Sequence, residues 1–337
     1  MKVLIIGGTG LLGSEGARAL ISRGHQVKTL ALPPLPQGAP LPEEMEVTFG
    51  NFIQMPDEEL LSHLKGCDGL VFAAGVDERL EGPPPIKAMF DRFNNLPLER
   101  LLSLAKSAGL RHAVICGSYF SHFAGAWPEL KLAERHPYIK SRLEQEAMAF
   151  SFADESFSVG VLQIPYVFGA QPGRQPVWMF LVEIIRKMPL ATFYPSGGTT
   201  MVTARQVGEA MAEALTATQG GQAWPLGCVN MTWKDMLTLF HENMGMPRRP
   251  VITIPGWAFA LGTRSRQNRL KKKGLETGLD YNHLADIMTR EAFIDPAVGC
   301  APLKLPPEDM KAAIGDSVRQ CMDILHGRVQ AIGMKGE

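Results

Sequence analysis

The first thirteen residues contain three glycines whose spacing suits phosphate binding. An apolar run over residues 1–6 is followed by Gly7, Gly10 and Gly13, and then by a helical pattern. Glycine allows a tight turn at the first position, close approach of a pyrophosphate at the second, and close helix packing at the third. The free N–H groups at the start of that helix would face the phosphate charge. This order predicts a dinucleotide site, the alternative being a glycine-rich turn without a ligand.

Five further segments lie at the ends of predicted strands or at the start of a helix. They are Asn51 and Phe52; Ala73, Ala74 and Gly75; Gly117 and Ser118; residues 137–142; and residues 165–169. A side chain in the first segment can hydrogen-bond an adenine amino group, and the small residues of the second leave room for a ribose and phosphates. Together with the glycine loop, this order resembles the extended short-chain dehydrogenase/reductase family. That family includes nucleotide-sugar epimerases, dehydratases, hydroxysteroid dehydrogenases and carbonyl reductases.

The resemblance implies a catalytic set of three residues. In the family, a serine hydroxyl binds the substrate oxygen and a tyrosine phenol transfers the proton while a nicotinamide transfers a hydride. A lysine four residues after the tyrosine binds the ribose and lowers the tyrosine pKa. Ser118 and Tyr138 match the first two positions, but the third is Arg142. Arginine at i+4 lies on the same helix face and supplies charge, yet it cannot release a proton at accessible pH. The site is therefore either a working variant or a cofactor-binding fold with weakened chemistry.

The glycine loop and the resemblance together give the residues expected to contact the cofactor. They are Gly7, Thr9, Gly10, Leu11, Leu12, Gly13, Asn51, Phe52, Ala73, Ala74, Gly75, Arg142, Pro165, Tyr166 and Val167. The end of the second strand, residues 29–33, has neither an acid for the ribose 2′-hydroxyl of NAD nor an arginine for the 2′-phosphate of NADP. Because no acid repels a 2′-phosphate there, the sequence slightly favours NADP over NAD.

Strands and helices alternate through the first half of the chain, which predicts an α/β fold with a parallel, doubly wound Rossmann sheet. Strands are expected at 3–6, 26–32, 47–49, 69–73, 112–116 and 158–163, and helices at 14–23, 57–64, 90–108 and 138–152. The less regular second half predicts helices at 207–216 and 232–244 and a late strand at 225–230. We expect a dinucleotide-binding domain of residues 1–170 and 201–230, and a smaller, mostly C-terminal substrate-binding region of residues 171–200 and 231–330.

Composition limits the class of protein and its compartment. Lysine plus arginine and aspartate plus glutamate number 34 each in 337 residues, so no net charge favours nucleic acid. The five cysteines form no CxxC pair, which argues against disulfides and a zinc site and for a reducing compartment. No apolar run is long enough to span a bilayer, so we expect a cytoplasmic protein. The basic run over residues 264–273 is expected to be a solvated helix face, and His122 and His136 to be surface or loop histidines.

The function expected from these features is that of an NAD(P)-dependent oxidoreductase, which interconverts a carbonyl and an alcohol on a small organic substrate. One alternative is a nucleotide-sugar epimerase or dehydratase, and another is a catalytically weakened NAD(P)-binding regulator or sensor. In the family, helices matching residues 90–108 and 138–152 pair across a two-fold axis, which predicts a homodimer. The apolar positions that could form this interface, or could instead cover the sheet, are Leu98, Leu101, Leu102, Ala105, Leu143, Ala147 and Phe150.

Overall fold

A parallel sheet of seven strands, in the order β11-β7-β6-β4-β1-β2-β3, forms the centre of the protein. The computed structural model describes residues 1–333. The strands are β1 Lys2–Ile6, β2 Gln26–Ala31, β3 Glu46–Phe49, β4 Gly69–Phe72, β6 His112–Cys116, β7 Ser158–Gln163 and β11 Gly221–Pro225. Every pairing in this sheet is parallel. Parallel sheets are covered on both faces, which explains why residues 3–6 of β1 are all apolar and at most 1% exposed.

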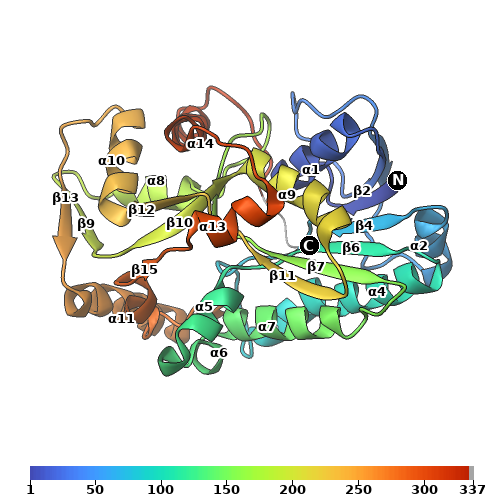
Figure 1. Cartoon of the computed structure of the whole chain (residues 1–337). Coiled ribbons are helices and arrows are strands. Elements are labelled where there is room, and N and C mark those ends of the chain that lie inside the picture. Colours follow the sequence, from blue (N-terminus) through green and yellow to red (C-terminus); the bar gives the residue numbers. More distant parts are fainter. Residues whose placement is uncertain (334–337) are drawn as a thin grey trace.

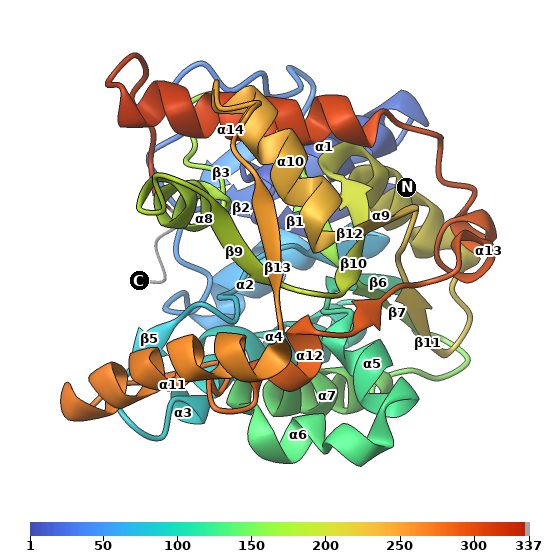
Figure 2. The same cartoon turned by 90° about the vertical axis from the view of Figure 1, so that its left-hand side faces the viewer.

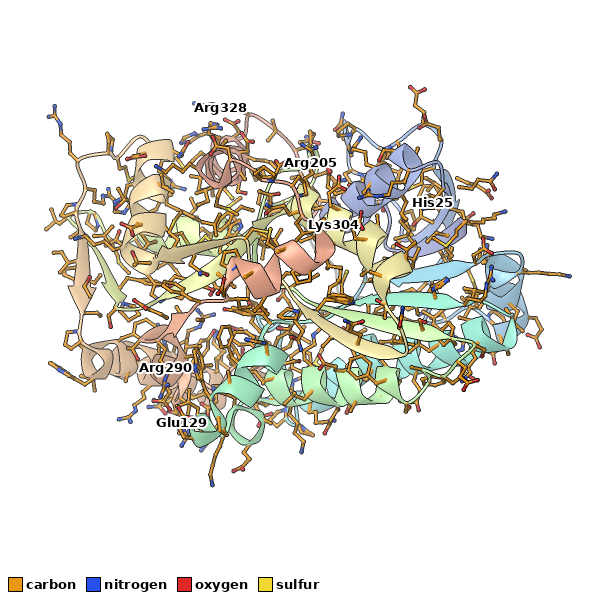
Figure 3. The ribbon with its side chains drawn as sticks, in the orientation of Figure 1. His25, Glu129, Arg205, Arg290, Lys304 and Arg328 are labelled. Carbon is orange, nitrogen blue, oxygen red and sulfur yellow. The ribbon has the colours of Figure 1, made fainter. Side chains whose placement is uncertain are left out.

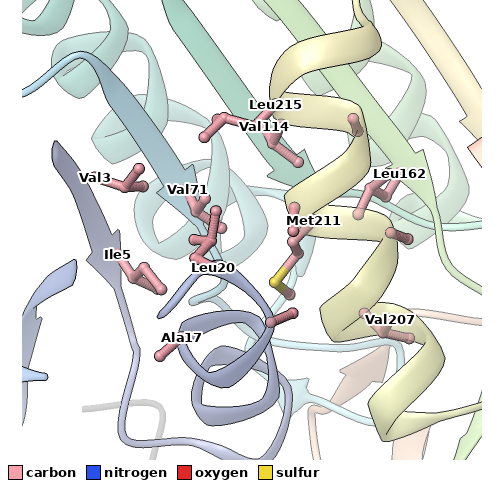
Figure 4. Packing of buried hydrophobic residues seen from close by; sticks show 14 of the residues in the cluster. Val3, Ile5, Ala17, Leu20, Val71, Val114, Leu162, Val207, Met211 and Leu215 are labelled. Carbon is pink, nitrogen blue, oxygen red and sulfur yellow. The ribbon is translucent and has the colours of Figure 1, made fainter. Parts of the chain in front are cut away.

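Helices cover both faces of this sheet (Figure 1). Alternate residues of β1 point to opposite faces of the sheet. Val3 and Ile5 lie on the face covered by α1 and α9 (Figure 4). Leu4 and Ile6 lie on the face covered by α2, α4 and α7. These helices are α1 Leu11–Ser22, α9 Ala204–Ala217, α2 Asp57–Leu64, α4 Leu96–Ser107 and α7 Pro137–Phe150. The fold class predicted from the sequence is confirmed.

The strand order reverses between β1 and β4. From β1 the chain proceeds to β2 and β3 on one side, and from β4 it proceeds to β6 and β7 on the other. In doubly wound sheets, ligands bind beyond the carboxyl ends of the strands at this switch point. The glycine loop follows β1 and residues 73–75 follow β4, so both lie at the switch point.

A smaller sheet lies beside the main one. Its path is β12-β10-β15, with β8 paired to β10, and its strands are β8 Tyr166–Phe168, β10 Gly198–Thr203, β12 Val229–Thr232 and β15 Glu291–Ala292. Two separate two-stranded sheets pair β9 Thr192–Pro195 with β13 Val251–Ile254, and β5 Glu81–Gly82 with β14 Glu276–Thr277. Strand β10 spans the domain boundary expected at 200/201, and β8 lies just before the one at 170/171. The division into two regions stays a prediction.

Several helices of the second half of the chain pack beside the smaller sheet (Figure 2). Helices α8, α10 and α14 share an apolar core with it that includes Trp178, Phe240 and Ile314. The elements are α8 Met179–Arg186, α10 Trp233–Asn243, α11 Gly256–Lys272, α12 Leu284–Met288, α13 Pro296–Gly299 and α14 Met310–Leu325. The short helices elsewhere are α3 Lys87–Phe90, α5 Phe120–Ala126 and α6 Leu132–Arg135. Among residues 1–333, none of the helices has the length and apolar character needed to cross a membrane.

Ion pairs connect segments that are distant in the sequence. Arg290, just before β15, pairs with Glu129 beyond α5 at 3.0 Å, and Arg205 of α9 pairs with Glu308 before α14 at 2.8 Å. Figure 3 shows Arg290 beside Glu129 below the smaller sheet, and Arg205 between α14 and α9. These pairs are largely exposed, so they orient the segments more than they stabilise them.

Two expected elements differ from the structure. The helix expected at 90–108 is helical from Lys87 to Ser107, but it contains a π-helical segment, Asp91–Asn95, between α3 and α4. The single late strand expected at 225–230 is wrong, because β11 ends at Pro225 and β12 begins at Val229. The chain leaves the main sheet after β11 and enters the smaller sheet at β12, so a turn must separate them.

The predicted dimer face on α4 is wrong. Leu98, Leu101, Leu102 and Ala105 are 0% exposed within one protomer, where they pack against the sheet. Apolar periodicity alone could not separate these two roles, because both need the same spacing. The homodimer itself stays a prediction.

The basic run lies on α11, which borders the second region (Figure 2). Arg264, Arg269, Lys271 and Lys272 are exposed, as expected of a solvated helix face. Arg266 has partners within the protein: it pairs with Glu81 at 3.1 Å, and its Cζ lies 4.7 Å from the centroid of the Tyr281 ring.

Candidate active site

Close backbone packing requires glycine at positions 7 and 13. Gly7 has φ +87°, and a Cβ there would come within 2.9 Å of the Ala73 carbonyl oxygen. A Cβ on Gly13 would come within 2.3 Å of the Gly7 carbonyl oxygen. At Gly10, by contrast, a Cβ would meet only the Gly7 oxygen, at 3.3 Å. Gly10 is therefore the least crowded of the three glycines, although a Cβ there would still press on a backbone oxygen, and it lies on the loop that would receive a pyrophosphate.

The start of α1 offers backbone donors to a ligand. No side chain caps this helix, and the first intrahelical bond runs from the Ser14 N–H to the Gly10 carbonyl at 2.9 Å. The N–H groups of Leu11, Leu12 and Gly13 precede that bond and have no intrahelical acceptor. Three such donors, with the positive end of the helix dipole, fit the pyrophosphate of a dinucleotide. Thr9 is buried, and its carbonyl accepts a bond from Gln171 at 3.2 Å.

The loop after β4 is held by Asn94 from the π-helical segment. The Asn94 side chain accepts the Val76 N–H at 2.8 Å and donates to the Val76 carbonyl at 2.9 Å. Gly75 has φ +129°, and a Cβ there would lie 2.5 Å from Asn94 Oδ1. Ala73, Ala74 and Gly75 are thus fixed beside the glycine loop.

Asn51 holds a turn in the segment after β3. Its Oδ1 accepts the Ile53 N–H at 3.1 Å, which is a local Asx turn. The Phe52 ring packs edge-on against Phe72, with centroids 5.9 Å apart. The contacts expected from Asn51 and Phe52 to adenine stay predictions.

Ser118 and Tyr138 both adjoin Phe120. Ser118 follows β6, is 5% exposed, and its Oγ accepts the Phe120 N–H at 3.3 Å. The Phe120 ring meets the Tyr138 ring edge-on, with centroids 6.4 Å apart. Phe120 thus contacts both residues, through its backbone N–H and through its ring. That Ser118 and Tyr138 act as partners stays a prediction.

Tyr138 is a buried residue in the first turn of α7. Pro137 starts the helix, and the Tyr138 N–H donates to the Gly278 carbonyl at 2.9 Å. The side chain is 4% exposed and packs against Phe90, with ring centroids 5.4 Å apart. Burial raises the pKa of Tyr138 above its ordinary value, and the charge of Arg142 opposes this shift without cancelling it. The phenol is therefore protonated near neutral pH.

Arg142 lies over the Tyr138 ring, on the helix face that its i+4 position predicts. Its Cζ is 5.1 Å from the ring centroid, a cation–π distance. One Nη donates to Gln145 Oε1 at 2.7 Å and the other to the Val76 carbonyl at 3.2 Å. The residue is 7% exposed, and its Nε has no hydrogen-bond partner among residues 1–333. These contacts fix a positive charge beside the phenol.

Pro165, Tyr166 and Val167 lie where the chain leaves the main sheet for the smaller one. Tyr166 contacts the rings of Trp178 and Trp233, with centroids 5.3 and 5.4 Å away. The Val167 carbonyl accepts the indole N–H of Trp178 at 2.9 Å. This aromatic group packs on β8, the strand that joins the smaller sheet.

Sequence reasoning missed Glu78, which follows the loop that Asn94 holds. The Glu78 carbonyl lies against Gly278, which also packs on Tyr138. Burial raises the pKa of Glu78 to about 7, and repulsion from Asp77 adds to the shift. Attraction by Arg79 and Arg142 opposes it. The acidic pair after a predicted strand was a visible signal, but its burial beside α7 was not.

His136 lies in the connection between α6 and α7, as expected of a loop histidine, but it is not at the surface. It directly precedes α7 and is 0% exposed, and its Nδ1 accepts the Asp280 N–H at 3.1 Å. Burial lowers the pKa of His136 to about 4. The residue therefore anchors the segment that carries Gly278 against the start of α7. Among residues 1–333, no group of three or more His, Cys, Asp or Glu could hold a metal ion.

The fold and this arrangement define a Rossmann protein of the extended short-chain dehydrogenase/reductase type. A model of the NAD dependent epimerase/dehydratase family matches residues 3–223, and the chain belongs to that family.

Individual proteins are similar to the chain over nearly its whole length. A Synechocystis sp. protein named "Putative dihydroflavonol 4-reductase" is 22% identical, over 97% of this chain and 95% of that protein. The crystal structure of gox2253 superposes with a TM-score of 0.74 at 20% identity, covering 97% of this chain and 99% of that one. The UDP-glucuronic acid 4-epimerase of Bacillus cereus, solved with NAD, gives a TM-score of 0.65 at 13% identity, covering 95% and 99%. The likeness to these structures supports the fold.

Proposed function

We propose that this protein is an NAD(P)-dependent oxidoreductase that reduces the carbonyl of a small organic substrate to an alcohol. One observation carries the proposal: Tyr138 is buried at the start of α7, with Arg142 over its ring. Phe120 contacts both Tyr138 and Ser118. The name of the Synechocystis relative refers to a reductase, which supports reduction over epimerisation.

The glycine loop fits the cofactor. The low crowding at Gly10 and the free N–H groups of Leu11, Leu12 and Gly13 suit a pyrophosphate. Arg142 and residues 165–167 would lie toward its ribose and nicotinamide. When bound, the nicotinamide supplies the hydride of the reduction.

The chain's own residues bind the substrate oxygen and provide its proton. The Ser118 hydroxyl donates a hydrogen bond to that oxygen, and the Tyr138 phenol, protonated at neutral pH, transfers its proton there. Arg142 then stabilises the phenolate by its fixed charge, but it does not pass on a proton. Glu78, with a pKa of about 7, is the nearby acid that can reprotonate Tyr138.

The experiment follows nicotinamide absorbance over a panel of aldehydes, ketones, sterols and sugar nucleotides. Tyr138→Phe removes one hydroxyl, so it should lower turnover by roughly 10²–10⁴-fold and leave cofactor binding unchanged in calorimetry. Tyr194→Phe is the matched control, because Tyr194 packs on Trp233 and Phe259 in the second region. If the rate survives Tyr138→Phe, the catalytic residue is assigned wrongly. Turnover confined to sugar nucleotides would point to the epimerase or dehydratase alternative.

A second candidate is a dinucleotide-binding regulator or sensor without turnover. The contacts of Arg142 to Gln145 and Val76 favour it, because they immobilise a group that cannot exchange a proton. In that case the wild type binds a dinucleotide but turns over no member of the panel.

A further inference from the structure

The segment after β8 lies against the glycine loop. Gln171, 6% exposed, donates from Nε2 to the Thr9 carbonyl at 3.2 Å and approaches Ser14 Oγ at 3.3 Å. A residue far along the chain is thus fixed on the loop and the first turn of α1. No local sequence pattern indicates this contact.

Arg174 is bound to the same glutamine. Its Nε donates to Gln171 Oε1 at 3.2 Å, and neither Nη has a hydrogen-bond partner among residues 1–333. The side chain is partly buried, and burial lowers the pKa of Arg174, with no carboxylate opposing the shift. Arg79 behaves differently: burial lowers its pKa, but hydrogen bonds and attraction to Asp77 raise it overall. Arg174 is therefore a partly desolvated cation without an anion in the described chain.

The backbone around Arg174 is held on two sides. Gln320 of α14 donates from Nε2 to the carbonyls of Gln171 at 2.6 Å and Arg174 at 2.7 Å. Ile332 donates to the Gly173 carbonyl at 2.8 Å and accepts the Gln175 N–H at 2.9 Å. A guanidinium on such a fixed segment is preorganised, which lowers the entropy cost of binding an anion.

The segment also lies against the loop that follows β2. Gly173 has φ +75°, and a Cβ there would come within 2.3 Å of the Gln37 carbonyl oxygen. In doubly wound folds, the residues at the end of this strand bind the adenosine ribose. Here that end is Leu32, Pro33 and Pro34, with neither an acid nor an arginine. Residues 171–174 therefore lie between the glycine loop and the loop after β2, and Arg174 is bound to Gln171 on this segment.

We propose that Arg174 binds the 2′-phosphate of NADP, in place of the arginine that β2 lacks. The proposal rests on the dinucleotide binding assumed in the proposed function. The two free Nη groups can form a bidentate pair with phosphate oxygens, which a point charge such as lysine cannot do. NADP is then the preferred cofactor, because the phosphate pairs a cation that NAD leaves unpaired.

The test is calorimetric titration of the full chain with NADP⁺ and NAD⁺. Arg174→Gln should weaken NADP⁺ binding about 10- to 100-fold, as expected for lost charge-assisted hydrogen bonds, and change NAD⁺ binding less than about twofold. Arg174→Lys should give an intermediate NADP⁺ affinity. Arg18→Gln is the matched control: Arg18 also contacts the loop after β2, at the Pro40 carbonyl, but has Glu15 as its partner.

A second titration isolates the phosphate. Adenosine 2′,5′-bisphosphate should bind the wild type more tightly than 5′-AMP, and Arg174→Gln should abolish that difference. If Arg174→Gln weakened the binding of NADP⁺ and of NAD⁺ equally, the proposal would be overturned, and Arg174 would instead contact the pyrophosphate or have a structural role. An unchanged NADP⁺ affinity in Arg174→Gln would also overturn it. If the wild type binds neither dinucleotide, the proposed function fails first, and that result is distinguishable from tight NAD⁺ binding without preference for NADP⁺.

Discussion

Acidification should destabilise the start of α7 through His136. This ring is 0% exposed, and its Nδ1 accepts the Asp280 N–H at 3.1 Å. Its Nε2 has no hydrogen-bond partner among residues 1–333. Burial lowers the pKa of His136 to about 4, although the charge of Asp280 opposes the shift. A protonated ring would lose its bond to Asp280, which helps to hold the segment bonded to Tyr138.

The difference between the pKa of His136 in the folded and in the unfolded chain sets the size of the change in the free energy of unfolding. The unfolded chain binds this proton near pH 6.5 and the folded chain only near pH 4, so the unfolded state takes it up first as the pH falls. The stabilising contribution is complete above about pH 6.5 and is lost as the pH falls toward 4. Between about pH 7.5 and pH 5 the loss is about 2 kcal/mol. For a chain of this size, that corresponds to a decrease in Tm of about 3 °C.

The assay is thermal unfolding, followed by circular dichroism, of the wild type and His136→Asn across this pH range. Asparagine can still accept the Asp280 N–H but does not titrate. His25, His112, His122 and His241 also have lowered pKa values, so only the difference in pH dependence between the two proteins measures His136.

Two further measurements complete the test. His326→Asn changes an exposed histidine and should leave the pH dependence unaltered. NMR titration of the wild-type ring should show no protonation of His136 above about pH 5. Identical pH dependence of Tm in wild type and His136→Asn, or a ring that titrates near pH 6.5, would refute the reasoning.

Three other predictions concern the site. Gly10→Val should abolish dinucleotide binding in calorimetry while the protein stays folded, because the Cβ there meets a single protein atom, the Gly7 oxygen at 3.3 Å, which must shift slightly. Gly125→Val, where a Cβ has nothing within 4 Å, is the control and should bind normally. Arg142→Lys should keep or raise activity and shift the pH optimum of kcat/KM, since lysine titrates and arginine does not; an unchanged pH profile would contradict this. Glu78→Gln should remove the fall in reductive kcat as the pH rises through about 7, the pKa of Glu78, because Glu78 acts only when Tyr138 is reprotonated. A fall that persists in the variant would exclude Glu78 as the proton source.

Local patterns made much of the fold predictable. Residues 3–6 and the three glycines following them fix a strand, a turn and a helix start within thirteen positions, and the structure has all three. Tyr138 and Arg142 could be placed on one helix face because i+4 spacing is a local property.

Nonlocal contacts were beyond this reasoning. Gln171 reaches Thr9 across more than a hundred residues, so no spacing rule could pair them. The burial of His136 depends on the segment near Asp280, which is also more than a hundred residues away in the sequence. The apolar face of α4 could have formed a dimer interface or covered the sheet, and only the three-dimensional structure shows that it covers the sheet.

Arg142 stands where the resemblance implies a lysine, and we expect this to affect the two directions of the proposed reaction differently. Reduction needs a protonated phenol, and the pKa of Tyr138, raised by burial despite Arg142, keeps it so at neutral pH. Oxidation needs a phenolate, which at a pKa above 10 is about one molecule in a thousand or fewer at pH 7. We therefore expect oxidative kcat/KM to rise about tenfold per pH unit between about pH 7 and 9, and reductive kcat/KM not to rise. Steady-state rates in both directions, measured over this range with the same alcohol and carbonyl pair, give the comparison. A flat oxidative profile would mean that Arg142 lowers the Tyr138 pKa in the working complex as fully as lysine does in the family.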